Sequence, residues 1–219
     1  MKDFGFIWRG LLAGACISLG GCIYIKVGGV AGAVLFAFGL IAVITLGLNL
    51  FTGKAQFVWS PRTAQSEQGG YVWLLAILLL NVLGCMAMGL LFSNPEMQQG
   101  AMGIMEKRLA ATPLRNGLLA IGCGFIMTLA VQSAAKGKWL PLLFGIPAFI
   151  ICGLPHCVAD AFYIASLPLE YIAGRSADIA IFYAAIVAGN FIGCNTYRVL
   201  QPKEVKVESE VSQEKAGTR

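Results

Sequence analysis

The sequence contains very little charge. Asp, Glu, Lys and Arg together make up 12% of its 219 residues, whereas 58% are hydrophobic, and neither Asp nor Glu occurs between Asp3 and Glu67. A soluble domain of this length needs far more charge on its surface, so the composition excludes that class. Because the uncharged stretches reach the roughly 20 residues that cross a hydrocarbon core, the sequence indicates an integral membrane protein.

Several chemical signatures are also missing. The seven cysteines form no Cys-x-x-Cys pair and lie in apolar surroundings, which indicates small, reduced core residues. Ser, His and Asp stand in no arrangement typical of covalent catalysis, and we expect no enzyme, no cofactor, no bound metal and no nucleic-acid partner. The net charge of +5 suits anionic lipid and an anionic solute equally.

Six apolar segments follow one another, and we expect each to form a transmembrane helix of an all-α, multi-pass protein. The N-terminal stretch lacks a signal-peptide cleavage site and is interpreted as part of the first span. Residues 1–200 would form a single transmembrane domain, and residues 201–219 a disordered, charged cytoplasmic tail. The segments cover residues 4–25, 30–58, 72–92, 117–134, 140–167 and 179–200, with a polar connection between the third and the fourth.

The two halves of the chain, residues 1–93 and 112–200, look related. Segments two and five are both long and interrupted, and Asn81-Val-Leu-Gly-Cys85 in the third resembles Asn190-Phe-Ile-Gly-Cys194 in the sixth. Three spans followed by three similar spans must have opposite topology, because three is odd. Interrupted segments at corresponding places in inverted halves point to a transport site at the middle of the membrane.

Lys and Arg favour one side of the membrane. With six spans both termini share a side, and that side carries more Lys and Arg than the other, much of the excess in the C-terminal tail. We therefore expect both termini in the cytoplasm and the protein in the cytoplasmic, or inner, membrane.

Both interruptions carry polar residues where lipid cannot satisfy the backbone. Such backbone must be buried in protein or line a watery cavity, and the freed N-terminus of a half-helix favours an anion. In the second segment Gly53 permits a tight turn and Thr52 supplies a hydroxyl. In the fifth, Gly153 and Pro155 break the helix beside His156, the only histidine. An intramembrane histidine is a functional candidate, although one that only binds a neighbouring carbonyl would be structural.

Bulky apolar residues approach both breaks. Phe36 and Leu40 are four residues apart, and Phe149 precedes His156 by seven, so each pair shares a helical face. Stacked in this way they would form a hydrophobic constriction that blocks hydrated ions. Ordinary helix packing would produce the same spacing.

Three other classes of function fit part of the sequence. His156 and Asp160, four residues apart, could ligate the cation of a divalent-metal transporter, but the chain has no second histidine. A neutral-solute pore of the aquaporin type would carry paired Asn-Pro-Ala motifs, which are absent. Two interrupted spans disfavour a non-transporting scaffold or receptor subunit.

Taken in order, the apolar motifs resemble the formate/nitrite transporter family. The resemblance implies an aquaporin-like protomer with an inverted 3+3 repeat, assembled as a homopentamer in which each protomer has its own pore. Members pass small monovalent anions: formate, nitrite, hydrosulfide, or short carboxylates such as lactate and acetate. The matching stretches are LLAGACISLGG, the FAFGL run at Phe36–Leu40, Leu50-Phe-Thr-Gly53, FIICGLPHCVADAFYIASLP and Gly189-Asn-Phe-Ile-Gly193, which together span nearly the whole chain up to about residue 200.

The resemblance also implies roles for residues along a pore. His156 would be the central histidine and Thr52 the loop threonine, flanked by Leu50 and Phe51. Constrictions would come from Phe36 with Leu40 on one side and from Phe149 on the other. The family's basic vestibule position falls at Arg108. We expect Arg108 and Lys54 to attract anions to the pore mouths, with Asp160 and Asn190 as polar partners.

Four positions depart from the family pattern. Pro155 precedes the histidine, where Glu is usual, and Asp160 follows it by four, where Asn is usual. Gly124 replaces an Asn of the fourth span, and Lys54 follows the Leu-Phe-Thr-Gly motif, where a small or amide residue is more common. We expect Asp160 and Lys54 to pair across the pore centre, which would lower the cost of burying both charges.

The resemblance implies the passage of a small monovalent anion, formate or nitrite foremost, through these residues. A bare anion in a low-dielectric site is costly, and Thr52, His156 and the half-helix N–H groups would replace its water. Protonation at the centre would remove the charge, which desolvation favours. His156 is the natural proton donor.

Overall fold

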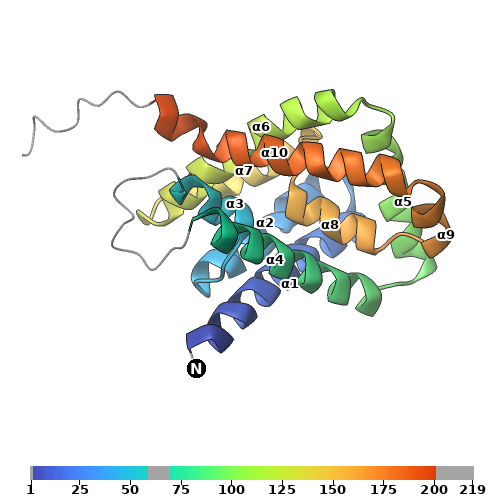
Figure 1. Ribbon diagram of the computed structural model, residues 1–219, viewed down its shortest axis with the longest axis horizontal. Helices are drawn as coiled ribbons and strands as arrows, with labels where there is room; N and C mark the ends of the chain where they lie inside the picture. Colours follow the sequence, from blue (N-terminus) through green and yellow to red (C-terminus); the bar gives the residue numbers. More distant parts are fainter. Residues whose placement is uncertain (1, 59–69, 201–219) are drawn as a thin grey trace, which may run out of the picture.

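The computed structural model describes residues 2–58 and 70–200, and every regular element within them is a helix (Figure 1). The prediction of an all-α fold is thus confirmed, while the tail predicted at residues 201–219 lies outside the described residues. The elements are α1 (Lys2–Val27), α2 (Gly29–Thr45), α3 (Phe51–Lys54), the single 3-10 turn η1 (Ala55–Phe57), α4 (Tyr71–Leu91), α5 (Pro95–Leu109), α6 (Pro113–Ala134), α7 (Leu140–Ile151), α8 (Cys157–Ala165), α9 (Leu169–Gly174) and α10 (Ser176–Leu200).

Within the described residues, four helices, α1, α4, α6 and α10, are long and apolar enough to cross a membrane, and α2 and α7 are shorter apolar helices. The outer surface is rich in large apolar side chains, among them Val72, Leu90 and Phe144, each more than 70% exposed. So much exposed apolar surface is unsuited to water and suits lipid or other subunits. The chain is therefore a multi-pass membrane protein.

The second and fifth apolar segments are each split into two helices. In the fifth, α7 and α8 are separated at Gly153, whose φ of 67° lies in the left-handed region that glycine adopts readily. In the second, the turn falls earlier than predicted, at Gly47 with a φ of 61°. The prediction of a tight turn at Gly53 is wrong, because Gly53 lies inside the short helix α3.

The segment expected as a polar connection between the third and fourth spans contains a helix. The Asn94 side chain accepts the Met97 N–H at 2.9 Å and Pro95 occupies the first turn of α5, a standard way to start a helix. Met105 on the same helix is fully buried. The connection thus folds back against the bundle, and the two basic residues of its last turn, Lys107 and Arg108, line a pocket.

Asn81 of α4 fastens the first break to α1. Its Nδ2 donates to the carbonyls of Gly10 and Asn49 at 2.9 and 2.8 Å, and its Oδ1 accepts the N–H of Phe51 at 2.8 Å. One buried side chain therefore satisfies three backbone groups where lipid could satisfy none.

Asn190 of α10 repeats this arrangement at the second break. Its Nδ2 donates to the carbonyls of Ala120 and Pro155 at 2.8 and 3.0 Å, and its Oδ1 accepts the N–H of Cys157 at 2.8 Å. The sequence repeat Asn-x-x-Gly-Cys thus corresponds to a repeated set of contacts.

The glycine of each repeat lets two long helices touch. A Cβ on Gly84 would lie 2.1 Å from the carbonyl oxygen of Leu11, and one on Gly193 would lie 2.0 Å from that of Ile121. Such distances leave no room for any side chain, so glycine is required for α4 to pack on α1 and α10 on α6.

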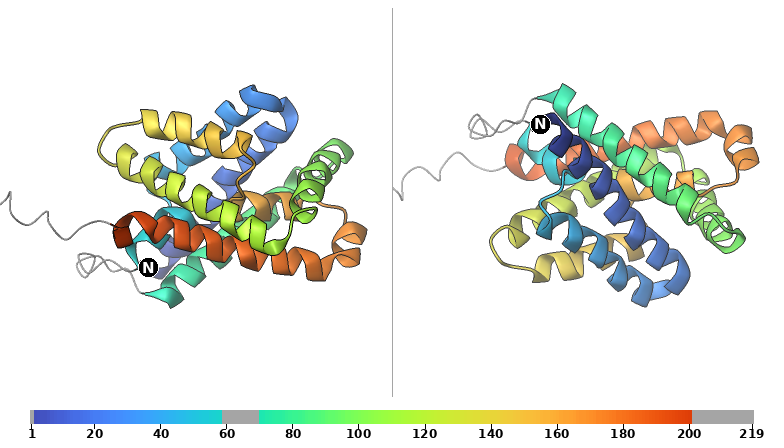
Figure 2. Two further views of the ribbon diagram at one scale, coloured as in Figure 1. Left: turned by 90° about the horizontal axis from the view of Figure 1, so that it is seen from above. Right: turned by 90° about the horizontal axis from the view of Figure 1, so that it is seen from below.

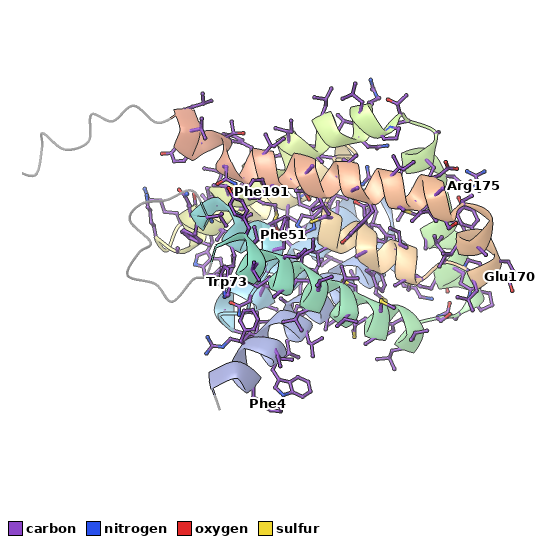
Figure 3. The ribbon with its side chains drawn as sticks, viewed as in Figure 1. Phe4, Phe51, Trp73, Glu170, Arg175 and Phe191 are labelled. Carbon is purple, nitrogen blue, oxygen red and sulfur yellow. The ribbon has the colours of Figure 1, made fainter. Side chains whose placement is uncertain are left out.

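The N-terminal end of α1 and the C-terminal end of α10 lie at the same end of the bundle, while α5 and α9 lie at the opposite end (Figures 1 and 2). Figure 3 shows Phe51 in the middle of the molecule, with Glu170 and Arg175 at the end that carries α9. The first break is therefore held in the interior of the molecule (Figure 3).

Candidate functional site

The two half-helices bring Thr52 and His156 into contact. Thr52 Oγ1 lies 2.9 Å from His156 Nε2, and both side chains are buried. Thiols hold each half-helix against a long helix: Cys194 Sγ of α10 donates to the Thr52 carbonyl of α3 at 3.2 Å, and Cys85 Sγ of α4 donates to the Val158 carbonyl of α8 at 3.3 Å. Polar residues separated by 104 positions in the chain thus form one centre.

The second ring nitrogen of His156 fixes the position of its proton. His156 is the N-cap of α8, and its Nδ1 accepts the Ala159 N–H at 3.2 Å. A nitrogen that accepts must present a lone pair, so the neutral ring carries its proton on Nε2 and donates it to Thr52 Oγ1. The Thr52 hydroxyl proton is then directed to a different acceptor.

The N–H groups at the start of α8 are already used inside the protein. The His156 N–H donates to Asp160 Oδ2 at 2.8 Å, and those of Cys157 and Ala159 bind Asn190 and His156. The expectation that these half-helix N–H groups replace the water of an anion is therefore wrong for these three donors.

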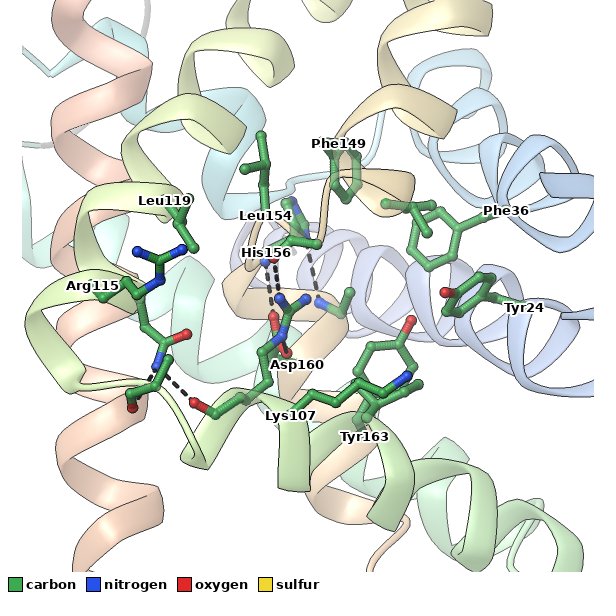
Figure 4. Close-up of a pocket in the computed structure, with 17 residues that line it drawn as sticks. Tyr24, Phe36, Lys107, Arg115, Leu119, Phe149, Leu154, His156, Asp160 and Tyr163 are labelled. Atoms are coloured by element: carbon green, nitrogen blue, oxygen red, sulfur yellow. Dashed lines mark hydrogen bonds and ion pairs between the residues drawn. The ribbon is translucent and has the colours of Figure 1, made fainter. Parts of the chain in front are cut away.

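A pocket of about 270 Å³ lies beside this centre (Figure 4). Phe36, Phe149 and His156 line it, and so do three basic residues, Lys107, Arg108 and Arg115. The sequence analysis identified Arg108 but missed Lys107 and Arg115. The basic run Lys107-Arg108 at the end of a capped helix was the available signal.

Arg108 is paired with Asp160. Its Nε donates to Asp160 Oδ1 at 3.1 Å, and its Nη1 donates to the Gly153 carbonyl. The predicted pairing of Asp160 with Lys54 is wrong. Lys54 lies in the last turn of α3 and has Arg9 as a charged neighbour.

Two aromatic rings line the pocket next to His156. The Phe36 and Phe149 rings meet edge to face with centroids 6.2 Å apart, and Phe149 stacks on His156 at 5.8 Å. Both are buried, as are the other apolar residues singled out from the sequence, Leu40, Leu50 and Phe51. The structure therefore brings Phe36 and Phe149 together, whereas Leu40, Leu50 and Phe51 do not line this pocket.

Two of the family departures have a structural reason. A Cβ on Gly124 would lie 2.3 Å from the carbonyl oxygen of Asn190, so α6 and α10 touch here and an asparagine would not fit. The Pro155 carbonyl accepts a hydrogen bond from Asn190 Nδ2. Because proline has no backbone N–H, Pro155 leaves no unpaired donor in the break.

His156 and Asp160 are not arranged as metal ligands. Both ring nitrogens of His156 have protein partners, and Asp160 binds Arg108 and a backbone N–H. Within residues 2–58 and 70–200, no three His, Cys, Asp or Glu side chains gather closely enough to hold a metal ion.

The sequence and fold are similar to those of known transporters and channels. "Uncharacterized transporter YrhG" of Bacillus subtilis (strain 168) is 29% identical over 84% of this chain and 74% of its own length. The "Probable formate transporter" of Methanothermobacter thermautotrophicus is 27% identical over 70% and 71%. A solved "Pentameric formate channel with formate bound" superposes with a TM-score of 0.74 at 19% identity, covering 91% of this chain and 95% of the channel. An "FNT family ion channel" gives a TM-score of 0.70 at 21% identity, covering 91% of both chains.

The family predicted from the motifs is confirmed by a family model. The model described as "Formate/nitrite transporter" matches residues 2–199, which is nearly all of the part that the structure describes. The chain belongs to the formate/nitrite transporter family.

Proposed function

We propose that the chain conducts small monovalent anions, formate or nitrite by preference, with hydrosulfide, lactate or acetate as further candidates. The Thr52–His156 contact beside a basic pocket carries this proposal. Membership of a transporter family supports it, as do the formate channel and the probable formate transporter among the similar proteins.

The proposed assembly is a homopentamer in the cytoplasmic, or inner, membrane, with both termini in the cytoplasm. Each protomer would cross the membrane six times, as two inverted halves with broken second and fifth segments. The matching contacts of Asn81 and Asn190 support the repeat. The similar formate channel is a pentamer, and the excess of Lys and Arg on the terminal side supports the orientation.

The proposed path begins in the basic pocket. Lys107, Arg108 and Arg115 would concentrate anions there, and Lys54 would do so at the other mouth. The Phe36 and Phe149 rings would exclude water and hydrated ions. The Thr52 hydroxyl would donate to the dehydrated anion, because His156 already donates to its oxygen.

Transient protonation of the anion at this centre is part of the proposal. The proton on His156 Nε2 can leave only if Nδ1 gains one, since the alternative is an imidazolate. Nδ1 is the acceptor for the Ala159 N–H, so a proton handover would require the α8 cap to open. Otherwise His156 acts only as a hydrogen-bond donor.

The test of the function is uptake into proteoliposomes. Formate, nitrite, hydrosulfide and lactate are compared at two pH values, with His156→Ala alongside. Uptake of one small anion that collapses in the variant supports the proposal. No anion uptake by the wild type, with zinc or manganese uptake in its place, overturns it.

His156→Asn separates the two roles of the histidine. Asparagine is a favoured N-cap, so it can keep the Ala159 contact while lacking a titratable ring. We expect reduced formate uptake that no longer rises at low pH. If the pH dependence is the same as in the wild type, His156 does not supply the proton.

A further inference from the structure

The guanidinium of Arg108 is held by the protein on two of its three nitrogens. Nε donates to Asp160 and Nη1 to the Gly153 carbonyl. Asp160 is fully buried, whereas the Arg108 side chain is 16% exposed at the pocket that it lines. The other oxygen of Asp160 accepts the His156 N–H at 2.8 Å. The carboxylate therefore sits between the pocket's arginine and the start of α8.

This contact removes a binding mode that arginine would otherwise offer. A guanidinium binds a carboxylate or another planar two-oxygen anion through two parallel N–H···O bonds. The side-on form of that pair needs Nε, which Asp160 holds at 3.1 Å. While this contact lasts, an anion in the pocket cannot form the side-on pair with Arg108.

We propose that Asp160 is a specificity-determining residue that prevents Arg108 from trapping planar two-oxygen anions side-on at the entrance to the pore. The inference rests on the proposed function and adds to it a reason why formate or nitrite would be released quickly. Conduction requires that an anion bind well enough to enter the pore and weakly enough to leave it. Asp160 supplies an internal carboxylate in the place that a substrate carboxylate would take.

Shape, and not charge alone, distinguishes this role. Lys107, Arg108 and Arg115 are the cationic residues that line the pocket, and Asp160 is the anionic one. Loss of the Asp160 charge would strengthen the attraction of every anion through space. Only an anion with two oxygens could also form the side-on pair through the freed Nε. Formate and nitrite should therefore gain more binding affinity than hydrosulfide, which has a single acceptor atom.

The decisive variant is Asp160→Asn in the full-length protein. It is isosteric, and its one carboxamide oxygen can accept from His156 N–H or from Arg108 Nε but not from both. Radiolabelled formate uptake into proteoliposomes gives the KM for formate and, by competition, the inhibition constants of nitrite and hydrosulfide. We expect the KM for formate to fall roughly tenfold, with a lower maximal rate because release is slower. The inhibition constant of nitrite should fall by a similar factor, and that of hydrosulfide should fall much less.

Arg108→Lys is the matched control, because lysine keeps the charge and lacks the planar fork. In the double variant Arg108→Lys/Asp160→Asn, the formate and hydrosulfide constants should change by the same factor. The proposal is overturned if Asp160→Asn alone changes the formate and hydrosulfide constants by the same factor. It is also overturned if the double variant changes the two constants as unequally as Asp160→Asn does.

Arg108→Lys alone tests the inference if Asp160→Asn does not assemble. Because Asp160 already blocks the side-on pair and Nη1 of the end-on pair donates to the Gly153 carbonyl, this variant should leave the ratio of the KM for formate to the hydrosulfide inhibition constant unchanged. A relative loss of formate affinity would mean that the fork acts in the wild type, against the proposal. Wild-type protein that takes up none of these anions would instead refute the proposed function.

Discussion

At the scale of single residues, Thr52 is the side chain whose removal should matter most. Its oxygen accepts from His156 Nε2 at 2.9 Å and its proton is free for another acceptor. Thr52→Val keeps the shape and removes both functions. A lost hydrogen bond to a charged group costs about 1.5–3 kcal/mol, so we expect formate uptake to fall roughly tenfold or more.

Thr52→Ser is the control for this substitution, since serine retains the hydroxyl. Its uptake should stay within a few-fold of the wild type, and both variants should be measured in proteoliposomes of equal protein content. If Thr52→Val takes up formate as fast as the wild type does, the hydroxyl does not contact the anion.

The sequence was sufficient for some residues of the site and not for others. Thr52 and His156 could be identified because each is polar and interrupts an apolar segment. The partner of Asp160 could not, because the pairing with Arg108 depends on how α5 folds back across 52 positions of chain. Only the three-dimensional path of that connection decides between Arg108 and Lys54.

At the scale of helices, the close approach of α6 and α10 is the most demanding packing. Gly193→Ala would place a Cβ 2.0 Å from the Ile121 carbonyl oxygen, and backbone on both sides cannot give way cheaply. Overpacking typically costs about 1–3 kcal/mol. We therefore expect a lower melting temperature in detergent, together with weaker uptake, because Asn190 fastens the break from the same helix.

Gly103→Ala is the matched control for this packing effect. Gly103 lies in α5, is exposed, and has no atom within 4 Å of an added Cβ. Alanine there should raise helix stability by up to about 1 kcal/mol. Equal melting temperatures for the two variants would mean that α6 and α10 do not pack as closely as the structure has them.

The helices also show where sequence patterns succeed and fail. Apolar length predicted α4 within a residue of its bounds, because a long uniform segment has one way to satisfy its backbone in lipid. The break in the second segment was placed several residues late, since Thr52 and Gly53 are polar or small yet helical. Polarity located the neighbourhood of the break, and only backbone geometry identified Gly47 as its turn.

At the scale of the whole molecule, the candidate site belongs to a single chain. The Thr52–His156 contact, the ring pair Phe36 and Phe149, and the basic pocket are all formed within one protomer. A pentamer of such chains would therefore contain separate pores and not one shared path. The large exposed apolar surface of the protomer would face lipid and neighbouring subunits.

Mixed pentamers distinguish separate pores from a shared one. Wild-type and Thr52→Val subunits carrying different tags are expressed together at varied ratios, and the pentamers are reconstituted for formate uptake. If each protomer conducts alone, uptake per pentamer should be proportional to the fraction of wild-type subunits, because a closed pore leaves its neighbours unaffected. Uptake far below that line would show that several subunits form one path. Native mass measurement in detergent gives the assembly itself, which should have five times the mass of the 23.3 kDa chain.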